Sequence, residues 1–307
     1  MNYCNYEALL EEAKSSSDEE RLISLSKHTS PWIRANVCQN PNATLKVLEI
    51  LSKDRNEKVL VSLAKREHLN HLIEFRIAKC DSIEARCTLA KSNTIPGDLL
   101  TVMSKDDNPK VRSMVALNRN TPYKTQIKLF SDSEDSVRAS VCLNETVDDK
   151  ILITGCIDDS DEVRIAVSIN PRTAPLLLKR LSKDSNEEVR RYVAGNENTN
   201  MDVVLSMLKD ESRVVRGSIA MRSDIDANTC SILMHDNDWS VRALVARNKN
   251  IYPSELEALS WDSDMVVRYA TLSNPNVTLD IAKTLSNDSE KFVCDKAKEV
   301  YQKLCDM

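Results

Sequence analysis

The chain has 307 residues, of which 41% are hydrophobic, 4% aromatic and 29% charged, and it contains only 4 glycines and 9 prolines. Scarce glycine and proline favour helices joined by short turns over a sheet protein, and the net charge of −5 argues against a general binder of nucleic acid or anionic membranes. The sequence has no run of 18 apolar residues that could span a bilayer and no secretory leader. Its nine cysteines are scattered and include no CxxC pair. We therefore expect a soluble cytoplasmic protein with free thiols.

Residues 1–27 are predicted to form a divergent N-terminal capping helix pair. The end of this segment, RLISLSKH (21–28), aligns with the LSKD segments that close later units. Residues 28–307 are predicted to form one continuous domain, because no linker and no change of composition divides them.

From residue 28 onwards the sequence repeats every 26 residues without insertion or deletion. Steps of 26 residues from Arg138 reach eleven positions, which we call the ladder positions, and nine of them hold arginine while the other two hold Leu60 and Cys294. Nine repeats have aspartate six residues before the ladder position, and seven have asparagine six residues after it. A period held this strictly predicts a repeat protein.

Each repeat is predicted to contain two helices of roughly 8–11 residues, which are too short to be stable alone. In the first helix, apolar residues one before and three and four after the ladder position share a face. The aspartate should lie near the start of this helix, and the asparagine should end it in a left-handed conformation. In NTPYKTQIKLF (120–130), Thr121 is expected to cap the second helix and Pro122 to begin it. About eleven such pairs must stack to bury their apolar faces, which predicts an all-α solenoid.

The repeat at residues 65–80, KREHLNHLIEFRIAKC, departs most from the others. His68, His71 and Glu74 are spaced so that they could share one face of a helix and bind zinc. Without a fourth ligand, the alternative is that the two histidines simply face solvent. We therefore expect no metal and no other cofactor.

The pattern D-x-x-x-x-V-R-x-x-V-A-x-N-x-x-T-P-x-x-L-L-x-x-L resembles the leucine-rich repeat variant of bacteria, a relative of HEAT repeats. It is clearest in DNPKVRSMVALNRNTP (107–122), and the resemblance covers about 28–307. The family implies a right-handed superhelix of short paired helices that serves as a binding or scaffolding surface. An iron–sulfur cluster held by clustered N-terminal cysteines occurs in the family, but only Cys4 and the distant Cys38 are present here, so this feature is not carried over.

Two missing residues indicate what the arginines contact. If each arginine paired with the aspartate of its own repeat, Arg34, Arg86, Asp54 and Asp288 would have no partners. If each instead pairs with the aspartate twenty residues later, in the next repeat, then Leu60 faces Cys80 and both partners are absent together. Partly buried arginine–aspartate pairs are costly to break singly, so joint loss is physically sensible.

The sequence therefore predicts a structural ladder between repeats, with phosphate binding by the same arginines as the alternative. Its members are Arg34–Asp54, Arg86–Asp106, Arg112–Asp132, Arg138–Asp158, Arg164–Asp184, Arg190–Asp210, Arg216–Asp236, Arg242–Asp262 and Arg268–Asp288.

The remaining face of the first helix carries apolar residues at positions that a single helix would expose, two and five residues after the ladder position. The alternative is that they pack between repeats. If exposed, they form a protein-binding surface. The candidate partner-binding residues are Met114, Leu117, Ser140, Leu143, Ile169, Tyr192, Met221 and Leu244.

The sequence contains neither a glycine-rich phosphate loop nor a nucleophile placed beside a base, so no motif in it indicates catalysis. We expect a non-enzymatic scaffold that binds a protein or peptide partner through the exposed face of the first helices. A nucleic-acid-binding protein or a DNA glycosylase, an activity that HEAT-like arrays host, is the alternative, and a purely structural spacer is a third. Convergence of Lys65, Arg66, Lys91, Arg222 and Arg247 on one face would favour nucleic acid.

Overall fold

The computed structural model describes residues 3–306, with side chains from Tyr6 onwards, and contains 23 α-helices and no strand within that range. The first helices of the pairs have odd numbers: α1 (Tyr3–Ser15), α3 (Pro31–Gln39), α5 (Glu57–Ala64), α7 (Ile83–Ala90), α9 (Pro109–Leu117), α11 (Asp135–Cys142), α13 (Asp161–Ile169), α15 (Glu187–Gly195), α17 (Arg213–Ala220), α19 (Trp239–Arg247), α21 (Met265–Thr271) and α23 (Lys291–Cys305). The second helices have even numbers: α2 (Glu19–Leu25), α4 (Leu45–Leu51), α6 (His71–Ala78), α8 (Gly97–Met103), α10 (Tyr123–Leu129), α12 (Asp149–Gly155), α14 (Pro175–Leu181), α16 (Met201–Ser206), α18 (Ala227–Leu233), α20 (Pro253–Leu259) and α22 (Leu279–Leu285).

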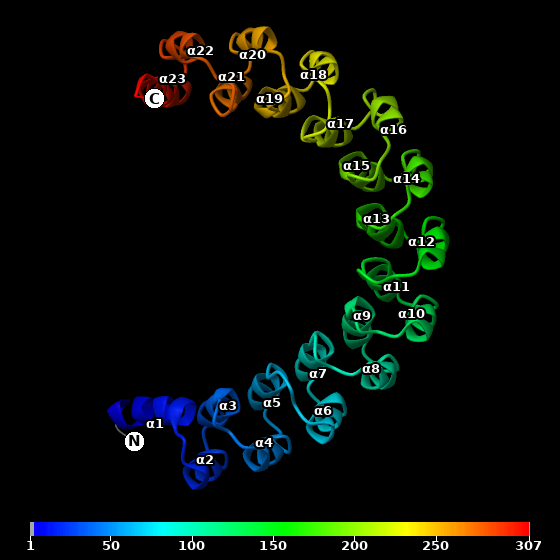
Figure 1. The fold of residues 1–307 in the computed structure, drawn as a ribbon, viewed down its shortest axis with the longest axis vertical. Helices are drawn as coiled ribbons and strands as arrows, with labels where there is room; N and C mark the ends of the chain where they lie inside the picture. The colour runs from blue at the N-terminus through cyan, green and yellow to red at the C-terminus, as the bar shows by residue number, and fades with distance from the viewer. Residues whose placement is uncertain (1–2, 307) are drawn as a thin grey trace. The chain divides into compact units, whose positions relative to one another are not determined.

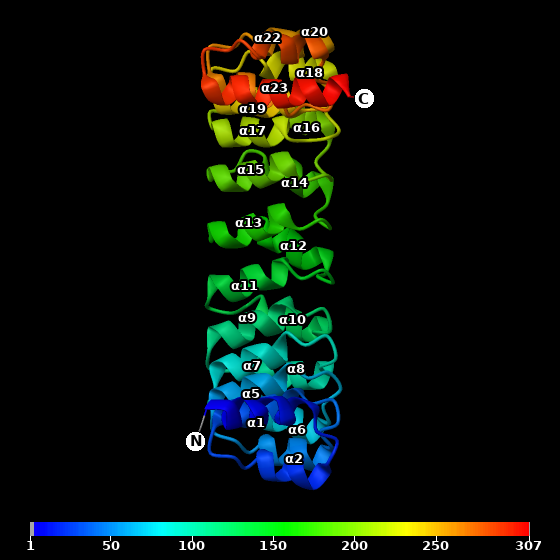
Figure 2. The same cartoon turned by 90° about the vertical axis from the view of Figure 1, so that its left-hand side faces the viewer.

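The chain divides into two compact units, unit 1 (Met1–Gly155) and unit 2 (Cys156–Met307). Within each unit, each odd-numbered helix packs on the next odd-numbered helix, and most also pack on their own even-numbered partner, as α9 does with α11 and α10. The helices of a unit therefore form an odd-helix layer and an even-helix layer, stacked repeat upon repeat (Figures 1 and 2). This is the predicted all-α solenoid. The division at residue 27 into a cap and one continuous array stays a prediction.

The core consists of the apolar residues predicted from the repeat. In α9, Val111, Val115 and Ala116 are fully buried, and in α15 the matching Val189 and Val193 are fully buried as well. Helices this short gain their stability from such contacts rather than from intrinsic propensity. No helix within residues 3–306 combines the length and the apolar character that crossing a membrane requires.

The asparagine that ends the first helix does not adopt the left-handed conformation predicted for it. Asn40 has φ −66° and ψ 122°, and Asn118 has φ −70° and ψ 127°, which are extended values. Among residues 3–306, His68 is the one non-glycine with a positive φ, 55°. The prediction was wrong because the asparagine ends the helix through its side chain, which bonds to the preceding repeat.

The aspartate six residues before the ladder position lies near the start of the first helix, as predicted, but it is not the capping residue. The cap of the first helix is the residue two positions further on, such as Ser212, whose hydroxyl accepts the Val214 N–H at 3.2 Å. Asp210 in turn accepts the N–H of Ser212 at 2.9 Å. The aspartate thus shapes the turn before the helix, and both of its carboxylate oxygens also accept hydrogen bonds from Arg190 of the neighbouring repeat.

The expected roles of Thr121 and Pro122 are shifted by one residue. Pro122 is the cap of α10, and the helix begins at Tyr123. The Thr121 hydroxyl donates to the Val115 carbonyl at the end of α9, at 2.5 Å, and Thr199 makes the same bond to Val193 at 2.6 Å. The threonine therefore closes the turn between the two helices by satisfying the end of the first one.

Candidate binding surface and the arginine ladder

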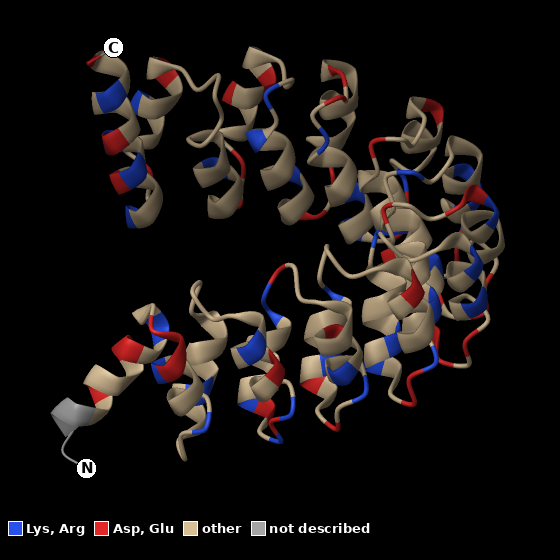
Figure 3. Ribbon diagram, turned by 60° about the horizontal axis from the view of Figure 1, so that its bottom comes forward, with Lys and Arg blue, Asp and Glu red and all other residues tan. Residues whose placement is uncertain are grey.

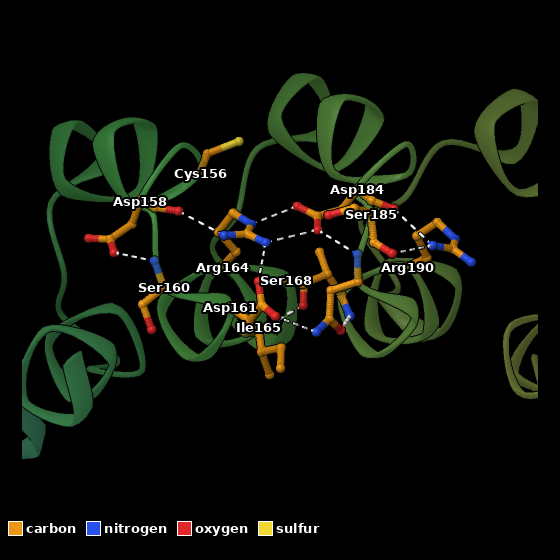
Figure 4. Close-up of polar contacts among 12 residues, drawn as sticks. Cys156, Asp158, Ser160, Asp161, Arg164, Ile165, Ser168, Asp184, Ser185 and Arg190 are labelled. Carbon is orange, nitrogen blue, oxygen red and sulfur yellow. Dashed lines mark hydrogen bonds and ion pairs between the residues drawn. The ribbon is translucent and has the colours of Figure 1, made fainter.

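Arg164 on α13 shows the geometry of the ladder (Figure 4). Its Nε donates to Asp184 Oδ2 at 2.7 Å and its Nη2 to Asp184 Oδ1 at 3.1 Å. Its Nη1 donates to the carbonyls of Asp158 and Asp159 in the turn before its own helix, at 2.9 and 3.1 Å. One guanidinium therefore joins the turn of its own repeat to the turn of the next.

Eight of the predicted pairs have this arrangement, with Nε–Oδ2 distances of 2.6–2.7 Å, arginine side chains 9–16% exposed and aspartate side chains 5–11% exposed. They are Arg34–Asp54, Arg86–Asp106, Arg112–Asp132, Arg164–Asp184, Arg190–Asp210, Arg216–Asp236, Arg242–Asp262 and Arg268–Asp288. The ninth pair, Arg138–Asp158, would span the two units and stays a prediction.

The electrostatics of a rung follow from burial and hydrogen bonding. Burial alone would raise the pKa of Asp210, but hydrogen bonds from Arg190 and from the Ser212 N–H outweigh it and lower that pKa. The hydrogen bond to Asp210 raises the pKa of Arg190 in return. Both groups are therefore held in their charged forms, and the guanidinium is already occupied by protein atoms.

A second ladder, formed by the asparagines, was not foreseen. Asn248 Nδ2 donates to the carbonyls of Ala220 and Arg222 in the preceding repeat, at 2.9 and 2.8 Å, and its Oδ1 accepts the Asn250 N–H. Asn40, Asn118, Asn144, Asn196 and Asn274 bind two carbonyls of the preceding repeat in the same way. These amides satisfy helix ends that the short helices leave open.

Arginine replaces the asparagine in two repeats and serves the same carbonyls. Arg66 Nη1 donates to Cys38 O and Asn40 O at 2.9 and 2.7 Å. Arg222, 7% exposed, reaches the carbonyls of Ala194 and Asn196 and is also paired with Asp224 at 2.7 Å. The recurrence of asparagine at this position was the feature of the sequence from which these bonds between repeats could have been predicted. Two of the five cations proposed as a nucleic-acid face are thus engaged within the fold.

The residues five after the ladder position are exposed rather than packed between repeats. Leu117 and Leu143 in unit 1 are 39% and 38% exposed, and Ile169 and Met221 in unit 2 are 40% and 70% exposed. The candidates two after the ladder position, Met114, Tyr192 and Leu244, are half-buried beside them.

Ser140 requires a correction. It is buried, and its hydroxyl donates to the Ser136 carbonyl at 2.7 Å, so it offers no free group to a partner. Leu143, three residues later, caps the end of α11 and is 38% exposed.

Two open hollows lie on the odd-helix layer where these residues cluster. In unit 1, a hollow of about 330 Å³ is lined by Met114, Leu117 and Leu143, with Lys91 and Arg119 at its rim. In unit 2, a hollow of about 590 Å³ is lined by Met221, Gly195, Ser218 and neighbouring polar residues. Gly195 stands where the three preceding repeats carry leucine or isoleucine, and a Cβ added there would meet nothing within 4 Å.

The spacing considered for a zinc site does not bring its three residues together. His68 lies in the turn before α6, which begins at His71 after the cap Asn70, so the three candidates do not share a helix face. Glu74 is buried, and burial raises the pKa of its carboxyl. Within the described part of the chain, no group of three or more potential ligands lies close enough together to hold a metal ion.

Charges of both signs are interspersed along the helix ends and turns of each unit (Figure 3). Lys65, Lys91 and Arg247 are exposed. In unit 1, however, Glu145 lines the same hollow as Lys91, and Glu57 and Glu84 line a further hollow with Lys65. Neither unit therefore presents a layer of a single sign.

The chain matches no protein-family model and no curated protein sequence. Among solved structures it is similar to a leucine-rich repeat variant with a novel repetitive structural motif, with 22% identity and a TM-score of 0.55 over 73% of this chain and 88% of that one. It also aligns with an engineered protein, with 14% identity and a TM-score of 0.31 over 97% of this chain and 94% of that one. A structure of the Pds5–Scc1 complex aligns with 16% identity and a TM-score of 0.32 over 97% of this chain and 63% of that one. The first of these similarities shows that the chain has the helical-repeat fold of a leucine-rich repeat variant.

Proposed function

We propose that this chain is a non-enzymatic scaffold whose odd-helix layer binds a protein or peptide partner. The observation that carries the proposal is the recurrence of exposed apolar side chains at one position of neighbouring repeats, Leu117 and Leu143 in unit 1, around a hollow that Met114 also lines. Single exposed apolar residues are ordinary, whereas a cluster with a charged rim is typical of a protein-binding surface.

The ladder supports this choice over nucleic-acid binding. Its arginines are the most regular cations of the sequence, and in the eight pairs described they bind aspartate and backbone carbonyls. A guanidinium engaged in this way cannot contact phosphate without breaking the joint between two repeats. We propose that the ladder serves the fold, and that binding depends on the exposed apolar positions.

The test compares substitutions on the two layers. Leu117→Glu and Leu143→Glu place a charge in the proposed surface, and Ile127→Glu is the matched control, because Ile127 is 43% exposed on the even-numbered helix α10. A partner captured from the native cells by the wild-type chain, and then purified, should bind both leucine variants at least tenfold more weakly and the isoleucine variant normally.

Equal binding by all the variants, or selective loss with Ile127→Glu, would contradict the proposal. Binding should also weaken little between 50 and 200 mM salt, about the range in which phosphate contacts weaken steeply. A steep salt dependence together with a captured nucleic acid would favour the alternative function.

A further inference from the structure

A hollow in unit 1 lies at the interrupted rung of the ladder. Leu60 on α5 and Cys80 after α6 stand where the other rungs have arginine and aspartate. Together with the turns that follow α4 and α6, they line an open space of about 400 Å³. This hollow, which we call the interrupted-rung hollow, shares no residue with the hollows of the odd-helix layer.

Unit 2 contains the same hollow at an intact rung, and it differs in charge. There, about 380 Å³ is bordered by three basic and three acidic side chains: Arg164, Arg180, Lys183, Asp158, Asp159 and Asp184. The interrupted-rung hollow is bordered by four basic and two acidic side chains: Lys53, Arg55, Arg76, Lys79, Asp54 and Asp81. The hollow at the intact rung is therefore neutral, whereas the interrupted-rung hollow carries two excess positive charges.

The cations of the interrupted-rung hollow have few partners within the protein. Asp54 is already bound by Arg34 at 2.6 Å, outside this group. The half-buried Arg76 donates from Nη1 to the Ser52 hydroxyl at 3.1 Å. Across residues 3–306, no ion pair joins Lys53, Arg55 or Lys79 to a carboxylate, so these charges are available to a ligand.

Two apolar side chains, Leu60 and Phe75, line part of the hollow beside these charges. Leu60, 3% exposed, stands where the other rungs have a guanidinium, and Phe75 is 43% exposed. A ligand that fits must combine an apolar or aromatic body with a strongly anionic group. A phosphate monoester carries about −1.5 to −2 charges near neutral pH, which matches the excess of the four cations better than a carboxylate does.

We propose that the interrupted-rung hollow is a binding site for an aromatic phosphate monoester, with Arg76 and Arg55 facing the phosphate and Phe75 facing the aromatic body. The joint loss of arginine and aspartate at this rung then has a function, because it places the apolar Leu60 beside these cations instead of an ion pair. Arginine is suited to this role because its planar donors match phosphate oxygens.

The probe is phenyl phosphate, titrated into the full-length protein at low salt and followed by calorimetry. The wild-type chain should bind it, and phenol should not bind. Arg76→Ala should weaken binding at least tenfold, whereas Arg180→Ala, the matched arginine at the intact rung, should leave it unchanged. Equal losses in the two variants, or none with Arg76→Ala, would overturn the proposal.

A second variant rebuilds the missing rung. Leu60→Arg together with Cys80→Asp should replace the apolar side chain in the hollow with an ion pair like that of Arg86 and Asp106 and add a carboxylate beside the cations. This variant should lose phenyl phosphate binding and keep an unfolding midpoint at least as high as in the wild type. Retained binding in this folded variant would exclude the site.

Two further ligands define the chemistry. Benzoate binding as tight as that of phenyl phosphate would contradict the assignment to phosphate. A short phosphotyrosine peptide that binds more tightly than phenyl phosphate would identify a peptide as the source of the ester, and weaker peptide binding would identify a small molecule.

Discussion

The side chain of Arg190 uses its whole hydrogen-bonding capacity within the fold. It donates twice to Asp210 at 2.7 and 3.0 Å, twice to the carbonyls of Asp184 and Ser185, and once to Glu211 at 3.4 Å. A guanidinium has five N–H groups, so each of them has a partner. Such a group rigidly couples two repeats, and removing either member leaves a buried charge or several unsatisfied carbonyls.

This coupling makes a single change more harmful than a double one. Arg190→Ala should destabilise the array by about 3 kcal/mol, because Asp210 keeps its charge and loses its main partner. Arg190→Leu combined with Asp210→Cys copies the natural pair Leu60 and Cys80 and should cost less. Urea unfolding of the full chain, with hydrogen exchange at α15 and α17, measures both effects. An equal or larger loss in the double variant would contradict a coupled pair.

At the scale of the helix pair, the asparagines solve a problem that short helices create. A helix of seven to nine residues has carbonyls at its end that no residue of the same helix can satisfy. Asn248 is buried and binds two such carbonyls of the preceding repeat, while its own oxygen closes the next turn. The asparagine is therefore a joint between neighbouring repeats as well as the end of one helix.

Changing the amide of Asn248 should separate these roles. Asn248→Ala leaves the carbonyls of Ala220 and Arg222 without their donor and should cost about 2 kcal/mol. Asn248→Asp should cost more, since a carboxylate would face two carbonyl oxygens. The exposed Asn237→Asp is the control and should change the unfolding midpoint little. A more stable Asn248→Asp than Asn248→Ala would show that the donor is not what matters.

The sequence predicted these elements unevenly, for physical reasons. The Asn period was visible, but its extended conformation was not, because the partners of Asn248 lie 26 and 28 residues earlier. An isolated turn would favour the left-handed state. The ladder partners were predictable because Leu60 and Cys80 are lost together. At the candidate surface, helical angles alone did not distinguish the exposed Leu143 from the buried Ser140, since the neighbouring helix decides which is covered.

At the scale of the whole chain, the same rung recurs in repeat after repeat, so its effects on stability accumulate. In repeat proteins, stability is close to a sum of repeat terms and neighbour terms. Burial opposes ionisation of Asp132, Asp210, Asp236 and Asp262, but hydrogen bonds from the arginines prevail and lower the pKa of each. For Asp288, the hydrogen bond from Arg268 is the largest influence and also lowers the pKa.

This repetition predicts a marked acid sensitivity. A carboxylate whose pKa is lower in the folded state than its ordinary 3.8 adds stability above that value and loses it as pH falls through the folded pKa. The thermal midpoint should therefore stay level from pH 7 to pH 5 and fall steeply below about pH 4. The gap between the wild type and Asp210→Asn should narrow over the same acidic range, because protonation removes the charge that the variant lacks. A decline that begins near pH 6 would instead implicate histidine, and an unchanged gap at pH 3 would show that the charge of Asp210 does not support the rung.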